Sequence, residues 1–536
     1  MIDRSKRYQR TLVPLEKLDV LAGRRIEFDG IAEMVAVRAA ESPDIPMVYF
    51  YDEMVTYAQV NRRANRVANF LKDKGVGQGD IVSTMVLNSP EIYYTMFGTQ
   101  KLGAVAGAIN YMLKGPEIAY VLDDSRPKVA FVGSDFMDEF ARGVEMAAHR
   151  PVVVEVVTEI VHQADIAACT LAQVLAKHPA DECLVPTGPD HPVMLLYSSG
   201  TTGMPKGILL SNRNELSICK GKAVLGVSRP GDVMMIILPM FHTNPLCVWS
   251  YPTIYIGSSL CIRKSFSPSD FWPSILRYGI TTVQGVPAMY DYIYRAADPA
   301  TIDYDRLKLR LAYSGAAPMP VNLVQAFKEK FSVEVIDGYG LTEACGVSST
   351  STSLPPKPGT IGTPFPGLEI EIMDAENRIL PYGEKGEICV RGDAIMLGYL
   401  NKPEATAESL KEGWLHTGDM GYMDEEGYLF ISGRIKEMIN RGGENIYPRE
   451  IEIPLEHHPK VAEVAVVGMP DPALGERVRA CIILKEPGSM SADDVRAYLK
   501  DKLAKYKIPE RVDFMDAFPR NPTGKILKHQ LKSMGL

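Results

Sequence analysis

The residues best suited to chemistry gather in one loop of hydroxyl groups, glycines and a single lysine. The loop reads Tyr197-Ser198-Ser199-Gly200-Thr201-Thr202-Gly203-Met204-Pro205-Lys206-Gly207 and lies between the apolar runs 193–196 and 208–210. Glycines permit the positive φ angles that turn consecutive backbone N–H groups toward an anion, while hydroxyls add donors and lysine adds positive charge. A polar surface turn is the plainer interpretation, but this density of donors favours a polyphosphate site. The predicted contacts are Ser198, Ser199, Gly200, Thr201, Thr202, Gly203 and Lys206.

Two other glycine-rich phosphate motifs do not fit this chain. A Walker A loop needs lysine directly after glycine at the start of a helix, whereas Met204-Pro205 separates Gly203 from Lys206. The stretch 75–79 carries three glycines, but it follows a helical pattern over 57–74. It therefore predicts the end of a helix and a turn, not the start of a dinucleotide-binding helix.

The composition excludes several function classes. With 536 residues, 46% hydrophobic and 23% charged, the chain is long enough for a large domain plus a smaller one. A net charge of −8 argues against non-specific binding to nucleic acid. The eight cysteines contain no C-x-x-C pair, which is typical of a reducing compartment. No apolar run approaches the ~20 residues that span a membrane, and the charged N-terminus predicts no signal peptide, so we expect a cytoplasmic protein.

Short apolar strands alternate with helical stretches before residue 355, and the pattern then changes. The alternation predicts an α/β fold with stacked, largely parallel sheets in an N-terminal domain, residues 1–433. From about residue 355 to 433, turn-rich segments and alternating strands predict a β-rich subdomain. After a charged connection at 434–436, residues 437–536 carry enough strand and helix for a small α+β domain.

The string S-S-G-T-T-G-x-P-K-G at 198–207 resembles the phosphate loop of the adenylate-forming enzymes. This superfamily contains acyl-CoA synthetases, adenylation domains and firefly luciferase, and the chain is closest in character to fatty-acyl-CoA or aryl-CoA ligases. Further segments resemble the superfamily in the same order along the chain: PMFHTN at 239–244, SGAAP at 314–318, DGYGLTE at 337–343, WLHTGD at 414–419, GRIKE with NRGGENIYP over 433–448, and PRNPTGKI at 519–526.

The resemblance implies roles for residues in each segment. The implied catalytic residues are His242, Thr342, Glu343 and Lys525, with Glu343 also the Mg²⁺ ligand. The implied ATP and AMP contacts beyond the phosphate loop are Gly315, Ala316, Ala317, Asp337, Gly338, Tyr339, Asp419 and Arg434. A buried structural histidine is the alternative for His242, and a solvated glutamate in a turn is the alternative for Glu343.

The remaining implied roles concern domain movement and the acid. Lys436 would be the hinge about which the small, mobile domain turns, and Gly442 and Gly443 would line the channel for coenzyme A. The acyl pocket would be lined by His242, Gly340, Cys345 and Gly346.

The implied function is an ATP-dependent acid–thiol ligase. A carboxylate would attack ATP to give an acyl-adenylate, and the thiol of coenzyme A would then displace AMP. The expected partners are a small-molecule carboxylic acid, ATP with Mg²⁺, and coenzyme A, with no nucleic acid and no integral membrane segment. A homodimer is one possible assembly.

The acid is the least determined part of this expectation. Acetyl- and propionyl-CoA synthetases are typically longer chains with tryptophan at the position of Gly340, so glycine there favours a fatty acid of medium or longer chain. An aryl or alicyclic carboxylate is the alternative. Different classes are a free-standing adenylation enzyme that loads a carrier protein, an oxidative luciferase-like enzyme, and a non-catalytic nucleotide-binding protein. The last is disfavoured because every expected polar role is filled.

Overall fold

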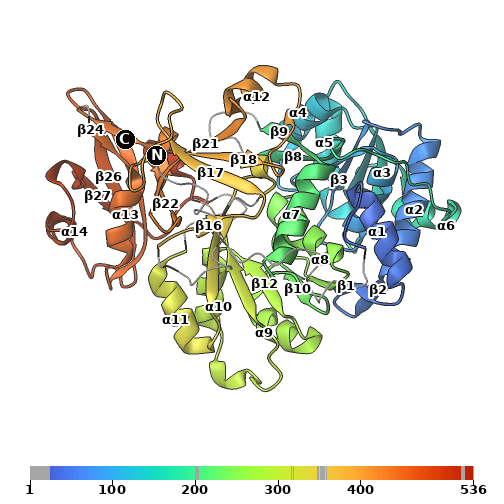
Figure 1. Cartoon of the computed structure of the whole chain (residues 1–536), viewed down its shortest axis with the longest axis horizontal. Helices are drawn as coiled ribbons and strands as arrows, with labels where there is room; N and C mark the ends of the chain where they lie inside the picture. Colours follow the sequence, from blue (N-terminus) through green and yellow to red (C-terminus); the bar gives the residue numbers. More distant parts are fainter. Residues whose placement is uncertain are drawn as a thin grey trace.

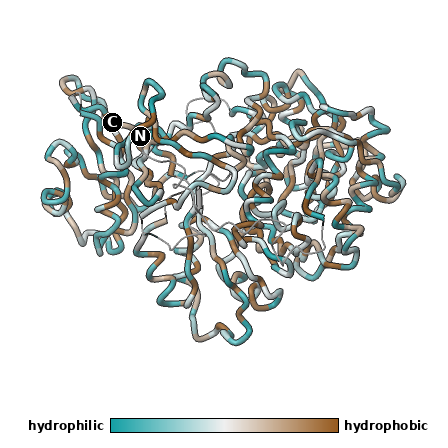
Figure 2. Tube along the Cα trace, in the orientation of Figure 1, coloured by the Kyte–Doolittle hydropathy of each residue, from teal (hydrophilic) through white to brown (hydrophobic). Residues whose placement is uncertain are grey.

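A computed structural model of the chain describes residues 25–198, 205–315, 317, 319–346, 349–350, 357, 359–442, 444–520 and 526–534. In Figure 1 the N-terminal elements lie on the right, the middle of the chain below, and the C-terminal elements on the left. Figure 2 shows that hydrophobic residues concentrate in the strands and in the helices between them, whereas the loops at the rim are hydrophilic. Over the described part of the chain, no helix is both long and apolar enough to cross a membrane.

The first sheet is parallel through its middle and ends in an antiparallel hairpin. Its strands, in spatial order, are β19 (Gly398–Tyr399), β9 (Lys206–Ser211), β8 (Pro192–Ser198), β4 (Val105–Ala108), β3 (Ile81–Met85), β5 (Val129–Gly133), β6 (Val152–Val156) and β7 (Ala167–Thr170). Strands β8 and β9 pair antiparallel, with Ser198 opposite Lys206. The predicted phosphate loop therefore connects the two strands of a hairpin.

The second sheet has the same character, with antiparallel strands only at its ends. Its strands, in spatial order, are β16 (Thr363–Pro364), β15 (Ser349–Thr350), β14 (Val335–Tyr339), β13 (Leu311–Ser314), β12 (Thr282–Gly285), β10 (Val233–Ile236), β11 (Ser259–Ile262), β1 (Pro46–Phe50) and β2 (Glu53–Thr56). From β14 to β1 each neighbouring pair is parallel. Because parallel strands end at the same edge of a sheet, the loops after β13 and β14 lie together.

Helices cover both sheets and fill the space between them. They are α1 (Ile31–Glu41), α2 (Tyr57–Asp73), α3 (Glu91–Lys101), α4 (Gly115–Ser125), η4 (Ser134–Phe136), α5 (Met137–Met146), α6 (Leu171–Lys177), α7 (Asn212–Val224), η5 (Asn244–Ser250), α8 (Tyr251–Tyr255), α9 (Pro268–Tyr278), α10 (Pro287–Ala296), η6 (Pro299–Thr301), α11 (Val321–Phe331) and η7 (Thr342–Ala344). Figure 1 shows α7 and α8 between the strands of the two sheets. Leu216 of α7 and Tyr251 of α8 are buried in one core with residues of both sheets.

Two further sheets complete the chain. The β-rich region contains β17 (Leu368–Met373), β18 (Gly386–Gly392), β21 (Trp414–Met423), β20 (Leu410–Lys411) and β22 (Leu429–Arg434), with α12 (Pro403–Ser409) beside them. The C-terminal sheet contains β24 (Glu444–Ile446), β23 (Ile439–Arg441), β26 (Gly475–Leu484), β25 (Val461–Asp471) and β27 (Arg511–Phe514). Its helices are η8 (Ile435–Glu437), α13 (Pro448–Glu456), α14 (Ala492–Lys500), η9 (Lys505–Lys507) and α15 (Lys528–Ser533).

The architecture confirms the predicted fold class: stacked, largely parallel sheets with helices, a β-rich region and a small α+β unit. The predicted hinge at 434–436 coincides with the end of β22 and the start of η8, before the C-terminal sheet begins. The domain bounds themselves stay a prediction. None of the eight cysteines, all of which are described, forms a disulfide.

We predict that Gly221 is required where α7 meets the β-rich region. A Cβ at this position would overlap the ring edge of Phe365. Overpacking of this kind costs about 1–3 kcal/mol, so Gly221→Ala should lower the free energy of unfolding measured in urea. In a Phe365→Leu background the same change should cost less, because the opposing ring is gone. A gain of about 0.5–1 kcal/mol, the ordinary effect of replacing a helical glycine by alanine, would contradict the close contact.

Candidate active site

The loops after β13 and β14 bring the predicted adenine-binding segments together. Ser314 pairs in register with Asp337, and a Cβ on Gly315 would lie 3.6 Å from the carbonyl oxygen of Gly338. The Asp337 carboxylate accepts hydrogen bonds from the backbone N–H groups of Met319 (3.2 Å) and Gly338 (3.1 Å). Burial raises the pKa of Asp337 to about 7. This carboxyl group therefore fixes the two loops to each other.

Tyr339, Asp419 and Arg434 form one polar group across two sheets. The hydroxyl of Tyr339 donates a 2.7 Å hydrogen bond to Asp419 Oδ2, and Arg434 Nε lies 3.1 Å from Asp419 Oδ1. Asp419 and Arg434 are also register partners on β21 and β22. Burial and then the neighbouring Asp419 carboxylate raise the pKa of Tyr339 well above its ordinary value. The structure thus brings together three of the residues that the resemblance assigns to the nucleotide, and their role stays a prediction.

Thr342 and Glu343 are held by contacts from two other segments of the chain. The Thr243 hydroxyl donates to the Thr342 hydroxyl at 3.0 Å. The Glu343 carboxylate accepts a 2.9 Å hydrogen bond from the hydroxyl of Tyr399, and the Lys206 ammonium lies 4.6 Å from the centre of the Tyr399 ring. Tyr399 therefore contacts Glu343 through its hydroxyl and Lys206 through its ring.

Tyr399 was missed by sequence reasoning. It lies on β19, an edge strand that pairs antiparallel with β9 next to the phosphate loop. The pairing joins residues almost two hundred positions apart, and the strand is too short to leave a local pattern. Only the tertiary structure identifies this tyrosine as part of the site.

The segment that carries His242 is held in place by contacts with Asn88 and Tyr111. The backbone N–H of Met240 donates to Asn88 Oδ1 at 2.8 Å, and the Phe241 ring packs edge-on against Tyr111 at 4.8 Å. Burial lowers the pKa of His242 to about 4, so the imidazole is neutral at pH 7. Within the described residues, its Nε2 has no hydrogen-bond partner. A neutral imidazole with a free ring nitrogen can accept from or donate to a substrate, but it does not supply a positive charge.

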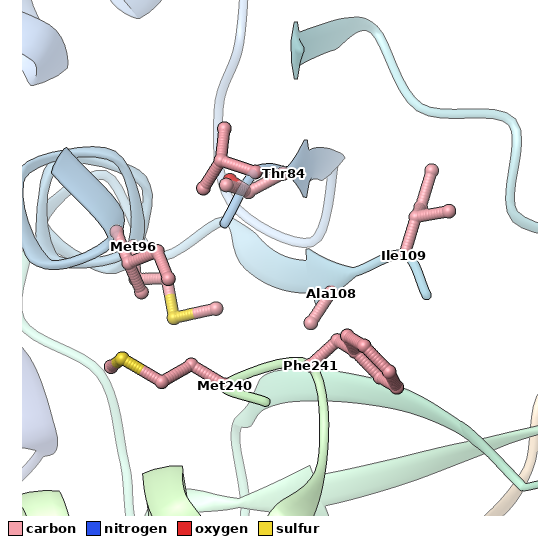
Figure 3. Close-up of a pocket in the computed structure, with 8 residues that line it drawn as sticks. Thr84, Met96, Ala108, Ile109, Met240 and Phe241 are labelled. Carbon is pink, nitrogen blue, oxygen red and sulfur yellow. The ribbon is translucent and has the colours of Figure 1, made fainter. Parts of the chain in front are cut away.

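A small apolar cavity lies behind the same segment (Figure 3). Met240 and Phe241 face it from one side, and side chains of β3, β4 and α3 face it from the other. Its one hydroxyl, on Thr84, already donates to Thr95 Oγ1 at 3.2 Å. The cavity therefore gives Met240 and Phe241 room to adjust and offers little to a polar ligand.

The predicted acyl-pocket residues lie where η7 approaches the π-helix η5. Gly346 has a φ of 86°, and a Cβ there would lie 2.6 Å from Val248 Cγ2 and 2.8 Å from Thr243 Cγ2, so only glycine fits. Cys345 is fully buried, and its sulfur lies within 4.8 Å of Cys247 and of a carboxyl oxygen of Glu215. The pKa of Glu215 is raised to about 7 by burial. Gly340 lies between β14 and η7.

The predicted hinge and its surroundings are charged. Lys436 is exposed on η8, directly after Arg434 and Ile435. Lys528 of α15 pairs with Glu437 at 3.1 Å and with Glu452 of α13 at 2.8 Å. Gly442, with a φ of 61°, turns the hairpin between β23 and β24. These contacts hold the segment after the hinge to the C-terminal sheet and its helices.

Several predicted site residues fall outside the described part of the chain. They are Ser199, Gly200, Thr201, Thr202, Gly203, Ala316, Gly443 and Lys525. Their flanking residues are described: Ser198 and Lys206 end and begin the two strands of the hairpin, and Ala317 follows β13. Roles for the absent residues rest on the sequence resemblance alone.

Comparison with known proteins identifies the family. The AMP-binding enzyme family matches residues 35–400, and the AMP-binding enzyme C-terminal domain matches residues 450–525. The chain is 36% identical over 514 residues to a fatty acid–[acyl-carrier-protein] ligase of Streptomyces coeruleorubidus, covering 94% of this chain and 96% of that one. It is 35% identical over 514 residues to a long-chain-fatty-acid–CoA ligase of Mycobacterium tuberculosis, covering 94% and 98%.

A solved structure has the same fold. The anthranilate CoA ligase in complex with anthranoyl-AMP superposes with a TM-score of 0.85 at 28% identity, covering 96% of this chain and 98% of that one. The chain therefore belongs to the AMP-binding enzyme family, the adenylate-forming superfamily that its motifs resemble. Within that family it is an AMP-forming acyl-CoA synthetase.

We predict that Asp419 is a main determinant of nucleotide binding. Hydrogen bonds to charged groups contribute about 1.5–3 kcal/mol, so Asp419→Asn should weaken ATP binding roughly 10- to 100-fold in a calorimetric titration. Tyr339→Phe keeps the ring and removes one hydroxyl, so its effect should be smaller. Glu369→Gln, on an exposed face of the same sheet, is the matched control. Equal ATP affinity in Asp419→Asn and Glu369→Gln would show that Asp419 does not contact the nucleotide.

Proposed function

We propose that this acyl-CoA synthetase joins a medium- or long-chain fatty acid to coenzyme A in two steps through an acyl-adenylate. The main support is the meeting of Tyr339, Asp419 and Arg434 beside the Glu343–Tyr399–Lys206 group. The first three offer a ring face, a carboxylate and a guanidinium to an adenosine. The second three offer a lysine and a carboxylate to a polyphosphate with its metal. Both lie near the ends of strands that carry the predicted loops.

The first step activates the acid. A carboxylate is a poor electrophile, and attack of its oxygen on the α-phosphate of ATP gives a mixed anhydride whose AMP leaves readily, with pyrophosphate as the other product. The enzyme contributes positioning and charge stabilisation rather than covalent chemistry. Lys206, the hydroxyls of the loop and Lys525 would stabilise phosphate charge, and the neutral His242 and Thr342 would position the carboxylate.

The Glu343 carboxylate fits a Mg²⁺ ion. This hard cation prefers oxygen ligands and is commonly held by one or two protein carboxylates together with substrate phosphates and water. Glu343 is half-buried and keeps its carboxylate in place through the Tyr399 hydroxyl. A bound ion would neutralise phosphate charge at this position.

The second step requires the small domain to turn. We propose Lys436 as the pivot because it is exposed on η8, where a backbone rotation meets little resistance. The pairs from Lys528 to Glu437 and Glu452 would make the segment beyond the pivot move as one body. The ion pair between Lys385 and Glu450 connects the β-rich region to α13 in the arrangement seen here, and rotation would break it. Gly442 and Gly443 would then approach the adenylate and admit the thiol.

Two observations support an acid with a substantial carbon skeleton. Gly340 offers no side chain at the position where acetate-specific relatives carry tryptophan, and the names of the two relatives above refer to fatty acids. The second candidate, an aryl or alicyclic acid, is favoured by the Trp249 and Tyr313 rings, which pack edge-on at 5.0 Å near the end of η5. The anthranilate ligase of the same fold acts on such an acid, as its name states.

An assay of purified enzyme distinguishes coenzyme A from a carrier protein as the thiol acceptor. The relative from Streptomyces is named for an acyl carrier protein, so a carrier remains the alternative to coenzyme A. Purified enzyme should release AMP with a suitable acid only when coenzyme A is added, and mass spectrometry should detect the acyl-CoA. If pyrophosphate exchange occurs but no thioester forms with coenzyme A, and a carrier protein restores thioester formation, the enzyme would instead be a ligase that loads a carrier protein.

Lys525 should separate the two half-reactions. If it stabilises only the adenylation transition state, Lys525→Ala should slow acyl-adenylate formation by at least ~10²-fold, the scale for losing one preorganised electrostatic contact. Thioester formation from supplied acyl-AMP should continue at the normal rate. Lys532→Ala, which removes a lysine of α15 seven residues further along the sequence, is the matched control. Equal losses in both half-reactions would contradict this division of roles.

Gly340 should control the size of the acid. Gly340→Trp should abolish activity on long acids while sparing or revealing activity on acetate and propionate. A single methylene in an apolar pocket is worth only ~1–3 kcal/mol, so a blocked pocket should discriminate far more strongly. Gly340→Ala is the control, and AMP release over an acid series is the measurement. An unchanged chain-length preference in Gly340→Trp would show that the acyl group lies elsewhere.

A further inference from the structure

Lys222 of α7 is a buried cation without an anion. Only 1% of the residue is exposed, and its ammonium lies 3.6 Å from the centre of the Trp249 ring and 4.8 Å from that of Tyr313. Over the described part of the chain, no hydrogen-bond acceptor or carboxylate contacts this ammonium. The buried Lys101 is different, since its ammonium lies 2.6 Å from Glu182. Lys528 likewise has two carboxylates.

Burying a lysine ammonium without an anion lowers the stability of the fold unless another group compensates the charge. Burial of an unpaired ammonium is strongly unfavourable, and aromatic faces return only part of the lost hydration. Burial lowers the pKa of Lys222 to about 7, so the charged form is disfavoured in the structure as it stands. Glu215 precedes Lys222 by seven residues on the same helix, about 10 Å along its axis, and its carboxyl lies beside Cys247 and Cys345. Glu215 therefore does not neutralise Lys222, and a bound anion would supply the missing counter-charge.

Lys222 contacts a ring of η5, the helix that approaches the predicted acyl-pocket residue Gly346. Trp249 is on η5, whose Asn244 lies next to Gly315 and whose Val248 lies next to Gly346. Tyr313 precedes Gly315 by two residues on β13. His242, where the reacting carboxylate would bind, precedes Trp249 by seven residues, and η5 begins two residues after His242. The ammonium thus lies beside one ring of η5 and one ring of β13, the two elements next to which the acid is expected to bind.

We propose that Lys222 is a specificity-determining residue that binds an anionic group, such as a carboxylate, at the far end of the substrate acid. The preferred substrate class would then be a medium-chain acid with a second, terminal acidic group. This inference rests on the proposed function, because it places the distal end of the same acid. A bound anion would compensate the buried ammonium, while Trp249 and Tyr313 would contact the carbon skeleton.

The test compares acids matched in length. AMP release is measured with hexanoate and adipate, and with octanoate and suberate, for the wild type and three variants. Lys222→Met removes the charge and keeps the length, Lys222→Arg keeps the charge, and Lys220→Met changes the neighbouring lysine that pairs with Glu27. The wild type should prefer the diacid of each pair in kcat/KM by at least ~10-fold, the scale for a hydrogen bond to a charged group.

The variants distinguish a substrate contact from a structural lysine. In Lys222→Met the diacid should lose at least ~10-fold in kcat/KM, while the monoacid should be unchanged or improved. Lys222→Arg should retain part of the diacid preference, and Lys220→Met should behave as the wild type. The melting temperature of ligand-free Lys222→Met should equal or exceed that of the wild type, because a buried unpaired charge has been removed.

The outcomes also separate this inference from the proposed function. AMP release with monoacids but not diacids, or an equal loss for both acids in Lys222→Met, would overturn the role of Lys222 and leave the ligase intact. If no acid released AMP, the proposed function would fail, and adipate would still be tested by the melting temperature. An adipate-dependent rise in the wild type that is absent in Lys222→Met would support the anion site, and equal shifts in both proteins would overturn it.

Discussion

The hydrogen bond from Tyr339 to Asp419 joins the second sheet to the β-rich sheet at the predicted nucleotide site. Tyr339 ends β14 of the second sheet, and Asp419 lies on β21 of the β-rich sheet. Asp419 is 6% exposed, so its carboxylate depends on the tyrosine and on Arg434 for partners. Arg434 in turn is the last residue of β22, directly before η8. The group that we propose as the nucleotide contact is thereby connected to the start of the proposed mobile segment, so ATP binding and domain position would share one charged cluster.

Much of this arrangement could be predicted from the sequence because its signals are local. The apolar run at 193–196 lies within β8, the helical pattern over 57–74 corresponds to α2, and the β-rich texture after residue 355 corresponds to β17 and its neighbours. What could not be predicted depends on contacts between distant segments. The hairpin depends on the antiparallel register of β8 against β9. Tyr399 reaches the site only because a short edge strand pairs with β9. Lys222 has an ordinary helical sequence around it, and only tertiary packing removes it from water.

Four buried ionisable groups lie on elements that carry predicted acyl- or adenylate-site residues, or next to them. Burial raises the pKa values of Glu215 and Asp337, and it lowers those of Lys222 and His242. These four groups lie on α7, on β14 and just before η5, the elements that surround the loops after β13 and β14. Clusters of shifted groups are commoner at functional sites than elsewhere. Their presence here agrees with a site that must handle carboxylates and phosphates away from bulk water.

The four groups nevertheless differ in how their burial is compensated. Asp337 receives two backbone N–H groups. Glu215 lies beside two thiols, but neither of its carboxyl oxygens has a hydrogen-bond partner among the described residues, and burial raises its pKa. His242 avoids the cost by remaining neutral at pH 7. Among the described residues Lys222 is met only by aromatic faces, which attract a cation without accepting its protons. Folding alone gains nothing from an ammonium at that position, where an apolar side chain of similar length would pack against the same rings. The compensating interaction is therefore sought in a bound molecule, and the proposed one is the acid that the enzyme activates.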